Sequence, residues 1–220
     1  MGEACQRAHR PAGSVTLIAI AKGQPVEKIR GTIRSGLLDI GENYAQEMLS
    51  HVGAIHELPL QPIRWHFVGH LQRKKVKQVT PQVSLIHSVD SLELAREIDL
   101  RAARCQKIQP ILIEVNLGGE SSKSGLDPTK VAELIPPISS LQNLLLKGFM
   151  TIPPFLPDVE KTRPFFRSLR EIRDEMNQRK LYSSPLFELS MGMTHDFEIA
   201  IEEGATMVRI GTGLFGPRSE

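Results

Sequence analysis

Short apolar runs rich in β-branched residues alternate with longer segments in which apolar residues recur every three or four positions. The runs occupy residues 15–21, 37–40, 64–68, 83–86, 110–115, 144–152, 186–190 and 206–210. Each has the length and composition of a buried strand, whereas the intervening segments have the period of an amphipathic helix. The pattern predicts eight strands with helices between them, the first three helices over residues 26–35, 45–57 and 72–79.

Capping residues predict where several of the later helices begin and end. Asp90 has the form of a helix N-cap, because an acidic residue follows three positions later. Asp127 directly precedes a proline, and Pro164 stands near the start of the next predicted helix. Gly204 is expected to end a helix that begins near residue 195.

The alternation of strands and helices predicts an α/β fold. Continuous apolar strands separated by amphipathic helices indicate a parallel sheet that helices cover. Eight such units in 220 residues suit a single (β/α)8 TIM-type barrel, and no linker-like stretch divides residues 1–220 into separate domains. An open doubly wound sheet has the same periodicity and stays as the alternative.

Composition and charge are those of an ordinary globular protein. The chain is 40% hydrophobic and 24% charged, and 27 Lys and Arg against 25 Asp and Glu give a net charge of +2. This balance gives no reason to expect wholesale disorder or a dedicated nucleic-acid binder. The two cysteines, Cys5 and Cys105, have no metal-ligand spacing, so neither a zinc ribbon nor a disulfide scaffold organises the fold.

No segment has the character of a membrane span or a targeting signal. The longest near-apolar run, residues 15–21, is far shorter than the roughly 20 residues that a span needs. The N-terminal sequence MGEACQRAHR also has no apolar core of a signal peptide. We therefore expect a cytoplasmic protein that binds neither membrane nor nucleic acid. No long exposed apolar stripe is evident, so we expect a monomer.

Polar and small residues follow most of the predicted strands, where a barrel places its functional groups. Lys22 comes directly after the apolar run 15–21. A lysine that leaves a desolvated barrel floor can have a lowered pKa and can attack a carbonyl as an amine nucleophile. The alternative is that Lys22 only marks the end of the strand and points to water.

Glycine-rich loops follow the last two predicted strands, where barrels often bind phosphate through backbone N–H groups. The first loop reads Ser-Met-Gly-Met over residues 190–193, and the second reads Gly-Thr-Gly-Leu-Phe-Gly over residues 211–216. The second matches GxGxxG, but a dinucleotide fingerprint needs a following helix and an acidic residue about 20 positions on. A simple glycine-rich turn is the alternative. Together with Lys22, the loops indicate a phosphorylated carbonyl ligand.

Three other features have ordinary explanations. His66 and His70 have metal-ligand spacing only on a helix, and His66 lies in a predicted strand. The basic run 73–77 has no interleaved aromatic residues, so a solvated helix face is expected there. Asp196 and the pair at 202–203 lie on a predicted helix and are expected to face solvent.

Seven motifs in fixed order carry a resemblance to a known family. They read IAIAK (18–22), IGEN (40–43), WHFVGHLQ (65–72), HSVD (87–90), EVN with SKSG (114–116 and 122–125), GFMTIPP (148–154), and LSMGMTHDF with MVRIGT (189–197 and 207–212). Together they resemble the pyridoxal phosphate homeostasis proteins of the YggS/PROSC type. The matches run from about residue 15 to residue 218.

The resemblance implies a barrel like the N-terminal domain of alanine racemase, with pyridoxal 5′-phosphate (PLP) as cofactor. Lys22 would form the internal Schiff base, and Arg209 would face the pyridine nitrogen. Asn43 and Met150 would lie near the ring. The phosphate would be held by Ser190, Gly192, Gly211 and Thr212. The family is associated with PLP (vitamin B6) homeostasis and with supply of PLP to apo-enzymes, so the chain is expected to be a non-catalytic carrier.

The residues near the expected cofactor agree with such a role. Arginine cannot take a proton from the pyridine nitrogen and leaves the ring a weaker electron sink, although alanine racemase also has arginine there. A racemase needs a second base, a tyrosine, and the only tyrosines here are Tyr44 and Tyr182. Gln24 stands where many relatives have a second lysine. A racemase and a class I aldolase acting on a phosphorylated sugar remain the enzymatic alternatives.

Overall fold

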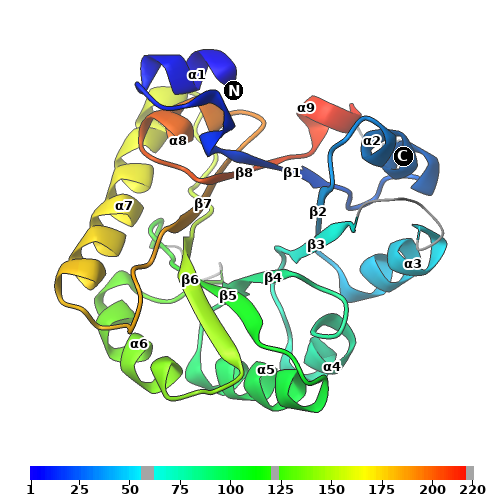
Figure 1. Ribbon diagram of the computed structural model, residues 1–220. Helices are drawn as coiled ribbons and strands as arrows, with labels where there is room; N and C mark the ends of the chain where they lie inside the picture. The colour runs from blue at the N-terminus through cyan, green and yellow to red at the C-terminus, as the bar shows by residue number, and fades with distance from the viewer. Residues whose placement is uncertain (56–61, 120–123, 217–220) are drawn as a thin grey trace.

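The computed structural model describes residues 1–55, 62–119 and 124–216, and its eight strands form a closed parallel barrel in sequence order (Figure 1). The strands are β1 (Thr16–Ile20), β2 (Asp39–Glu42), β3 (Arg64–Phe67), β4 (Leu85–Val89), β5 (Gln109–Glu114), β6 (Leu144–Met150), β7 (Glu188–Met193) and β8 (Met207–Ile210). β1 pairs with β8, with Leu17 opposite Val208, and this closure excludes the open sheet. The predicted (β/α)8 barrel is confirmed.

Helices surround the barrel (Figure 1). They are α1 (Gly2–Arg7), α2 (Val26–Arg34), α3 (Ala45–Ile55), α4 (Val76–Val79), α5 (Leu92–Arg104), α6 (Val131–Ser139), α7 (Arg163–Gln178), α8 (Phe197–Glu202) and α9 (Thr212–Phe215). The apolar face of each longer helix is buried, as at Ile29 and Ile33 of α2. The end of the predicted helix 45–57 lies outside the described residues. No helix of the described chain is long and apolar enough to cross a membrane.

Three strands extend past the apolar runs that predicted them. The runs 37–40, 83–86 and 186–190 become β2, β4 and β7, which end at residues 42, 89 and 193. The added residues at the ends of these strands include polar ones such as Glu42 and His87, both fully buried. Hydrophobicity fails to mark these ends because buried polar side chains are tolerated where they have hydrogen-bond partners: Glu42 contacts His51 of α3, and His87 contacts Ser190.

The capping predictions hold with one exception. Asp127 Oδ1 accepts a hydrogen bond of 2.8 Å from Thr129 N, and Pro164 lies in the first turn of α7. Gly204 follows α8 with φ of +102°, a conformation that glycine adopts freely. The N-cap of α5 is Ser91 rather than Asp90: its Oγ accepts from Leu94 N at 3.4 Å. Both residues are cap formers, so sequence alone does not separate them.

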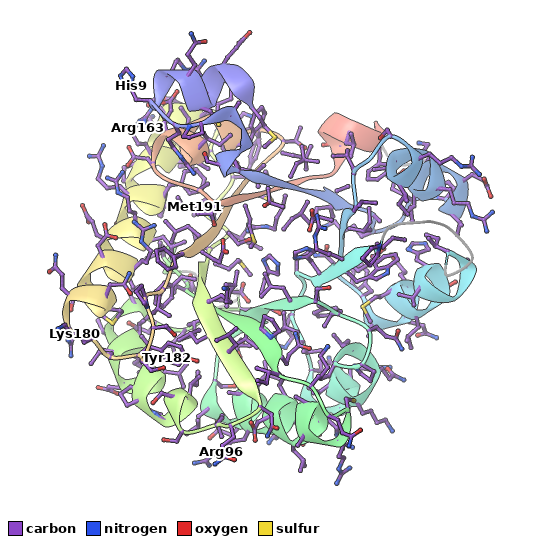
Figure 2. All side chains as sticks on the ribbon, viewed as in Figure 1. His9, Arg96, Arg163, Lys180, Tyr182 and Met191 are labelled. Atoms are coloured by element: carbon purple, nitrogen blue, oxygen red, sulfur yellow. The ribbon has the colours of Figure 1, made fainter. Side chains whose placement is uncertain are left out.

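The acidic residues at 196, 202 and 203 do not face solvent as predicted. Asp196 is 5% exposed, and its Oδ1 accepts a hydrogen bond of 2.7 Å from Met193 N. Glu203 is 4% exposed and lies among three arginines of α7, of which Arg163 is labelled in Figure 2. Glu202 pairs with Arg163 and with Arg7 of α1. Helix α7 supplies this positive charge, which local sequence cannot reveal.

Candidate functional site

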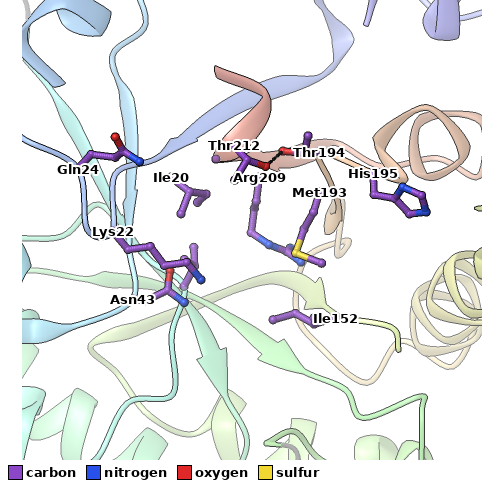
Figure 3. Close-up of a pocket in the computed structure, with 12 residues that line it drawn as sticks. Ile20, Lys22, Gln24, Asn43, Ile152, Met193, Thr194, His195, Arg209 and Thr212 are labelled. Carbon is purple, nitrogen blue, oxygen red and sulfur yellow. Dashed lines mark hydrogen bonds between the residues drawn. The ribbon is translucent and has the colours of Figure 1, made fainter. Parts of the chain in front are cut away.

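A pocket of about 260 Å³ opens at the carboxyl ends of the strands, where a barrel carries its functional groups (Figure 3). Five of the eight predicted site residues line it: Lys22, Asn43, Arg209, Gly211 and Thr212. They come from the ends of β1, β2 and β8, which are neighbours in the barrel. Barrel closure therefore brings together residues that are up to 190 positions apart in the chain.

Lys22 and Asn43 lie on the same side of the pocket. Figure 3 shows the Lys22 side chain extending from the end of β1 across the pocket, with Asn43 nearby. Asn43 Oδ1 is buried and has no hydrogen-bond partner in the described part of the chain. A buried acceptor of this kind is costly unless a ligand supplies the missing donor. The pocket thus combines a primary amine with an unused acceptor.

Arg209 extends from β8 into the pocket, and two hydrogen bonds hold its guanidinium group in place. It is 4% exposed, and its Nη1 and Nη2 donate hydrogen bonds to Ser190 Oγ at 2.6 Å and to the carbonyl oxygen of Thr151 at 2.9 Å. Burial lowers the pKa of Arg209 to about 10, against the opposing effect of Glu114 and Asp196. The guanidinium therefore stays charged at neutral pH and presents donors, never an acceptor, to a ligand.

A chain of buried polar side chains continues from Ser190 through the barrel interior. Ser190 Oγ lies 2.9 Å from His87 Nδ1, and His87 Nε2 lies 3.0 Å from His66 Nδ1. His66 Nε2 lies 3.0 Å from Asp39 Oδ1, and Asp39 also binds Arg64. Arginine can only donate and a carboxylate can only accept. A proton on Nε2 of each histidine therefore satisfies every link from Arg209 to Asp39.

The charge states along this chain follow from burial and partners. Burial lowers the pKa of His87 well below its ordinary value, and the charges of His66 and Arg209 act in the same direction. His87 is therefore neutral. Burial by itself raises the pKa of Asp39, but hydrogen bonds from His66 and Arg64 outweigh it and lower this pKa to about 2. An ionised Asp39 thus terminates the chain, and a neutral His87 lies at its centre.

Three predicted site residues lie beneath the pocket rather than in its lining. Met150 is fully buried against Leu85 and Leu112. The Ser190 hydroxyl is already bound to Arg209 and His87. Gly192 has φ of +90°, and a Cβ there would lie 2.5 Å from the Cβ of Ala200. Their predicted contacts with a cofactor remain predictions.

The other seven lining residues were not among the eight predicted cofactor contacts, although Gln24 was expected near the cofactor and Met193 in a phosphate loop: Ile20, Gln24, Val68, Ile152, Met193, Thr194 and His195. Thr194 matters most, because its Oγ1 accepts a hydrogen bond of 3.1 Å from Gly213 N and lies 3.4 Å from Thr212 Oγ1. It thereby joins the loops that follow β7 and β8. Its place in the MGMTHD segment after β7 was the available signal, but threonine alone is too common to stand out.

The metal alternative finds no support in the described residues. His66 is bound to His87 and Asp39, whereas His70 lies near Ser124 and Asp90. No group of three or more His, Cys, Asp or Glu in the described ranges could hold a metal ion. The glycine-rich segment after β8 forms the single turn of α9.

The residues present fit PLP. A half-buried lysine meets the aldehyde that PLP carries, and a charged arginine donor can meet the lone pair of a neutral pyridine nitrogen. The orphaned Asn43 Oδ1 and the hydroxyls of Thr194 and Thr212 provide further polar contacts. The site thus has a group suited to each polar end of this cofactor.

Comparison with known proteins agrees with this chemistry. The family model described as "Alanine racemase, N-terminal domain" matches residues 11–219. The chain is 48% identical over 216 residues to the pyridoxal phosphate homeostasis protein of Aquifex aeolicus, covering 98% of this chain and 92% of that protein. Identity to the protein of the same name from Pseudomonas aeruginosa is 38%, covering 98% and 90%.

Solved structures that superpose on this chain include a relative of the same kind and a more distant protein of the same fold. PipY of Synechococcus elongatus, a structure with PLP bound, superposes with a TM-score of 0.86 at 34% identity, covering 97% of this chain and 98% of that chain. Alanine racemase of Clostridium difficile has a TM-score of 0.73 at 14% identity, covering 99% of this chain and 59% of that one, which shows a shared fold alone. The chain therefore belongs to the pyridoxal phosphate homeostasis protein family, built on the alanine racemase N-terminal domain fold.

Proposed function

We propose that this protein binds PLP through a covalent bond between Lys22 Nζ and the aldehyde carbon of the cofactor. It then holds PLP in the cytoplasm in an exchangeable form and supplies it to PLP-dependent apo-enzymes. The observation that carries the proposal is the convergence of Lys22, Asn43 and Arg209 on one pocket. The names of the relatives and the PLP-bound PipY structure support it.

Each of these residues has a distinct task in the proposal. PLP, when bound, supplies an aldehyde that condenses reversibly with primary amines. Lys22 provides the amine, and Asn43 provides an acceptor beside it. Arg209 keeps its charge and donates to the ring nitrogen, which therefore stays unprotonated. A neutral pyridine is a weaker electron sink, so bound amines are held with little drive toward further reaction.

The phosphate is assigned to the rim formed by the loops after β7 and β8. Thr194 and Thr212 bring two hydroxyls together there, and Gly211 leaves the backbone accessible. The fully buried hydroxyl of Ser190 instead holds Arg209. We therefore propose that the hydroxyl of Thr194, rather than that of Ser190, contacts the phosphate.

A carrier role fits the pocket better than a racemase role. Racemisation requires a second base on the face opposite the lysine. Tyr44 is 59% exposed, and Tyr182 binds Leu146 N at the start of β6, away from the pocket (Figure 2). Neither tyrosine lines the pocket. We propose that the protein turns over amino acids slowly or not at all.

The test of the cofactor proposal is absorption spectroscopy followed by reduction. PLP is added to the purified protein, the visible spectrum is recorded, and borohydride then fixes any adduct for peptide mass analysis. We expect a yellow protein with a pyridoxyl group on Lys22, and no such adduct in Lys22→Ala. Lys161→Ala is the matched control, because Lys161 is exposed and does not line the pocket. A colourless protein, or an adduct on another lysine, would contradict the proposal.

The carrier role has its own test. The PLP-loaded protein is mixed with an apo-aminotransferase, and recovery of aminotransferase activity is compared with recovery in free PLP at equal concentration. In parallel, L-alanine is followed for loss of optical activity. We expect recovery of activity without racemisation at ordinary enzymatic rates. Racemisation that Lys22→Ala abolishes would establish an enzyme instead.

A further inference from the structure

A second cavity of about 250 Å³ adjoins the proposed cofactor pocket. Asn43, Val68 and Ile152 line both spaces, so the two share a wall. The rest of its lining comes from the ends of β3 and β5 and the segment after them: Gly69, His70, Glu114, Val115, Asn116 and Ser124. The motifs of the sequence include several of these residues, yet PLP binding as proposed gives Glu114 no role.

Glu114 is a buried carboxyl group without a donor. It is the last residue of β5 and is 7% exposed, and its carboxyl group makes no hydrogen bond or ion pair with the rest of the described chain. Burial, together with the nearby charge of Asp90, raises its pKa to about 7, while Arg209 acts in the opposite direction. A buried carboxylate needs a positive partner or several donors, and the residues that the structure describes supply neither in direct contact.

Two further acceptor groups lie in the wall of the cavity or close to Glu114. Asn43 Oδ1 in the shared wall has no hydrogen-bond partner in the described ranges. Asp90, after β4, adds a second carboxylate, 3.9 Å from His70 Nδ1 at the mouth. The nearby guanidinium of Arg209 is already bound to Ser190 and Thr151. Unused acceptors and negative charge thus meet in a space that exceeds the roughly 30 Å³ of one water molecule.

We propose that this cavity binds the ammonium group of a small organic amine, with Glu114 as its counter-ion and Asn43 Oδ1 as a second acceptor. An ammonium group carries three N–H donors and one positive charge, which match the unpaired acceptors. The cavity adjoins the pocket that Lys22 lines, so such an amine would lie close to an aldehyde bound in that pocket. This last point rests on the proposed function, whereas amine binding itself does not.

The binding site is tested on the full chain without PLP, by NMR titration with ethylammonium chloride. We expect shifts of the amide signals of Gly69, Val115 and Asn116, which line the cavity. Glu114→Gln is expected to weaken binding about tenfold or more, because it removes a charge-assisted hydrogen bond. Glu93→Gln is the matched control, since Glu93 is exposed on α5, and it is expected to bind as the natural protein does.

The dependence on pH and on ligand type sharpens the test. Among the described residues, the titratable and charged groups around Glu114 are Asp90, His70 and Arg209, with Lys22 in the adjoining pocket. Binding is expected to tighten from pH 6 to pH 8 as Glu114 ionises, and this change is expected to vanish in Glu114→Gln. Potassium, and tetramethylammonium, which has charge but no N–H donor, are expected to bind much more weakly.

Three results would overturn the inference. They are no localised shifts at pH 8, equal affinity in Glu114→Gln, and equal binding of potassium or tetramethylammonium, which would indicate a general cation effect. The proposed function is measured separately by PLP absorbance on Lys22. Amine binding without PLP binding would contradict the cofactor proposal and leave the assignment of this cavity in place. PLP binding without amine binding would contradict the cavity assignment and leave the cofactor proposal in place.

Discussion

Ser190 Oγ accepts a hydrogen bond of 2.6 Å from Arg209 Nη1, and this contact connects the ligand pocket to the polar interior of the barrel. The two residues lie on adjacent strands, β7 and β8. Ser190 in turn contacts His87, from which the chain continues to His66 and Asp39. The orientation of Arg209 is therefore set by residues that do not line the pocket themselves.

Replacing His87 should break this chain at its centre. His87→Leu removes two hydrogen bonds, so the Ser190 hydroxyl keeps only Arg209 as a partner and the His66 ring keeps only Asp39. We expect a loss of about 2–4 kcal/mol in the free energy of unfolding, measured by urea titration. The ring ¹⁵N shifts of His66 should change at the same time. Unchanged stability together with unchanged shifts would show that the chain is not continuous in solution.

Glu114 should make the protein less stable as pH rises. Its pKa in the fold is about 7 against an ordinary 4.5, so the folded state binds the proton more tightly than the unfolded state. The contribution of Glu114 to the free energy of unfolding is therefore greatest below pH 4.5. It falls by about 3 kcal/mol in all as the pH rises from 4.5 past 7. Glu114→Gln should remove this fall. Urea unfolding at pH 5 and pH 8 measures it, and parallel profiles for both proteins would contradict it.

Gly192 should not tolerate a side chain. Gly192→Ala places a Cβ 2.5 Å from that of Ala200 in a backbone with φ of +90°, so we expect a cost of at least ~2 kcal/mol in unfolding free energy. Gly31→Ala is the matched control, because a Cβ at that position of α2 meets nothing within 4 Å. It should stabilise the helix by about 0.5–1 kcal/mol. Similar effects of the two substitutions would contradict the strained geometry.

Glu203 should hold α8 to α7 through its arginine partners. Its carboxylate lies 3.1–3.2 Å from Arg163, Arg167 and Arg170. Burial alone raises the pKa of Glu203, but hydrogen bonds from Arg167 and Arg163 outweigh it and lower this pKa. The stabilisation is thus present above the ordinary pKa of 4.5 and is lost as pH falls below it.

Glu203→Gln is expected to lower the free energy of unfolding by about 2 kcal/mol at pH 7. The loss is no larger because the arginines are partly exposed, so solvent screens their charges. Glu175→Gln, which affects only an exposed pair with Arg179 on α7, should have little effect. Thermal unfolding of both variants and of the unchanged protein at pH 7 and pH 4 measures these effects. Equal effects of both substitutions would show that burial adds nothing to the Glu203 cluster.

The sequence by itself determined the order of the elements and the motifs. Apolar runs such as 15–21 are visible locally because a strand buried on both sides must be apolar over most of its length. Lys22 and Arg209 were identified from the strand ends and the family motifs, and the structure brings them to one pocket. These features depend on residues that are neighbours in the chain.

Only the tertiary structure decided which polar residues are buried and with whom. Barrel closure places Asp39, His66, His87 and Ser190 in one hydrogen-bonded chain, although they come from four different strands. It also buries Glu203 against α7, and it leaves the Glu114 carboxyl group without a donor among the residues that the structure describes. Local hydrophobicity treats such residues as exposed, because their burial is made favourable by partners that are distant in sequence and that only the closed barrel supplies.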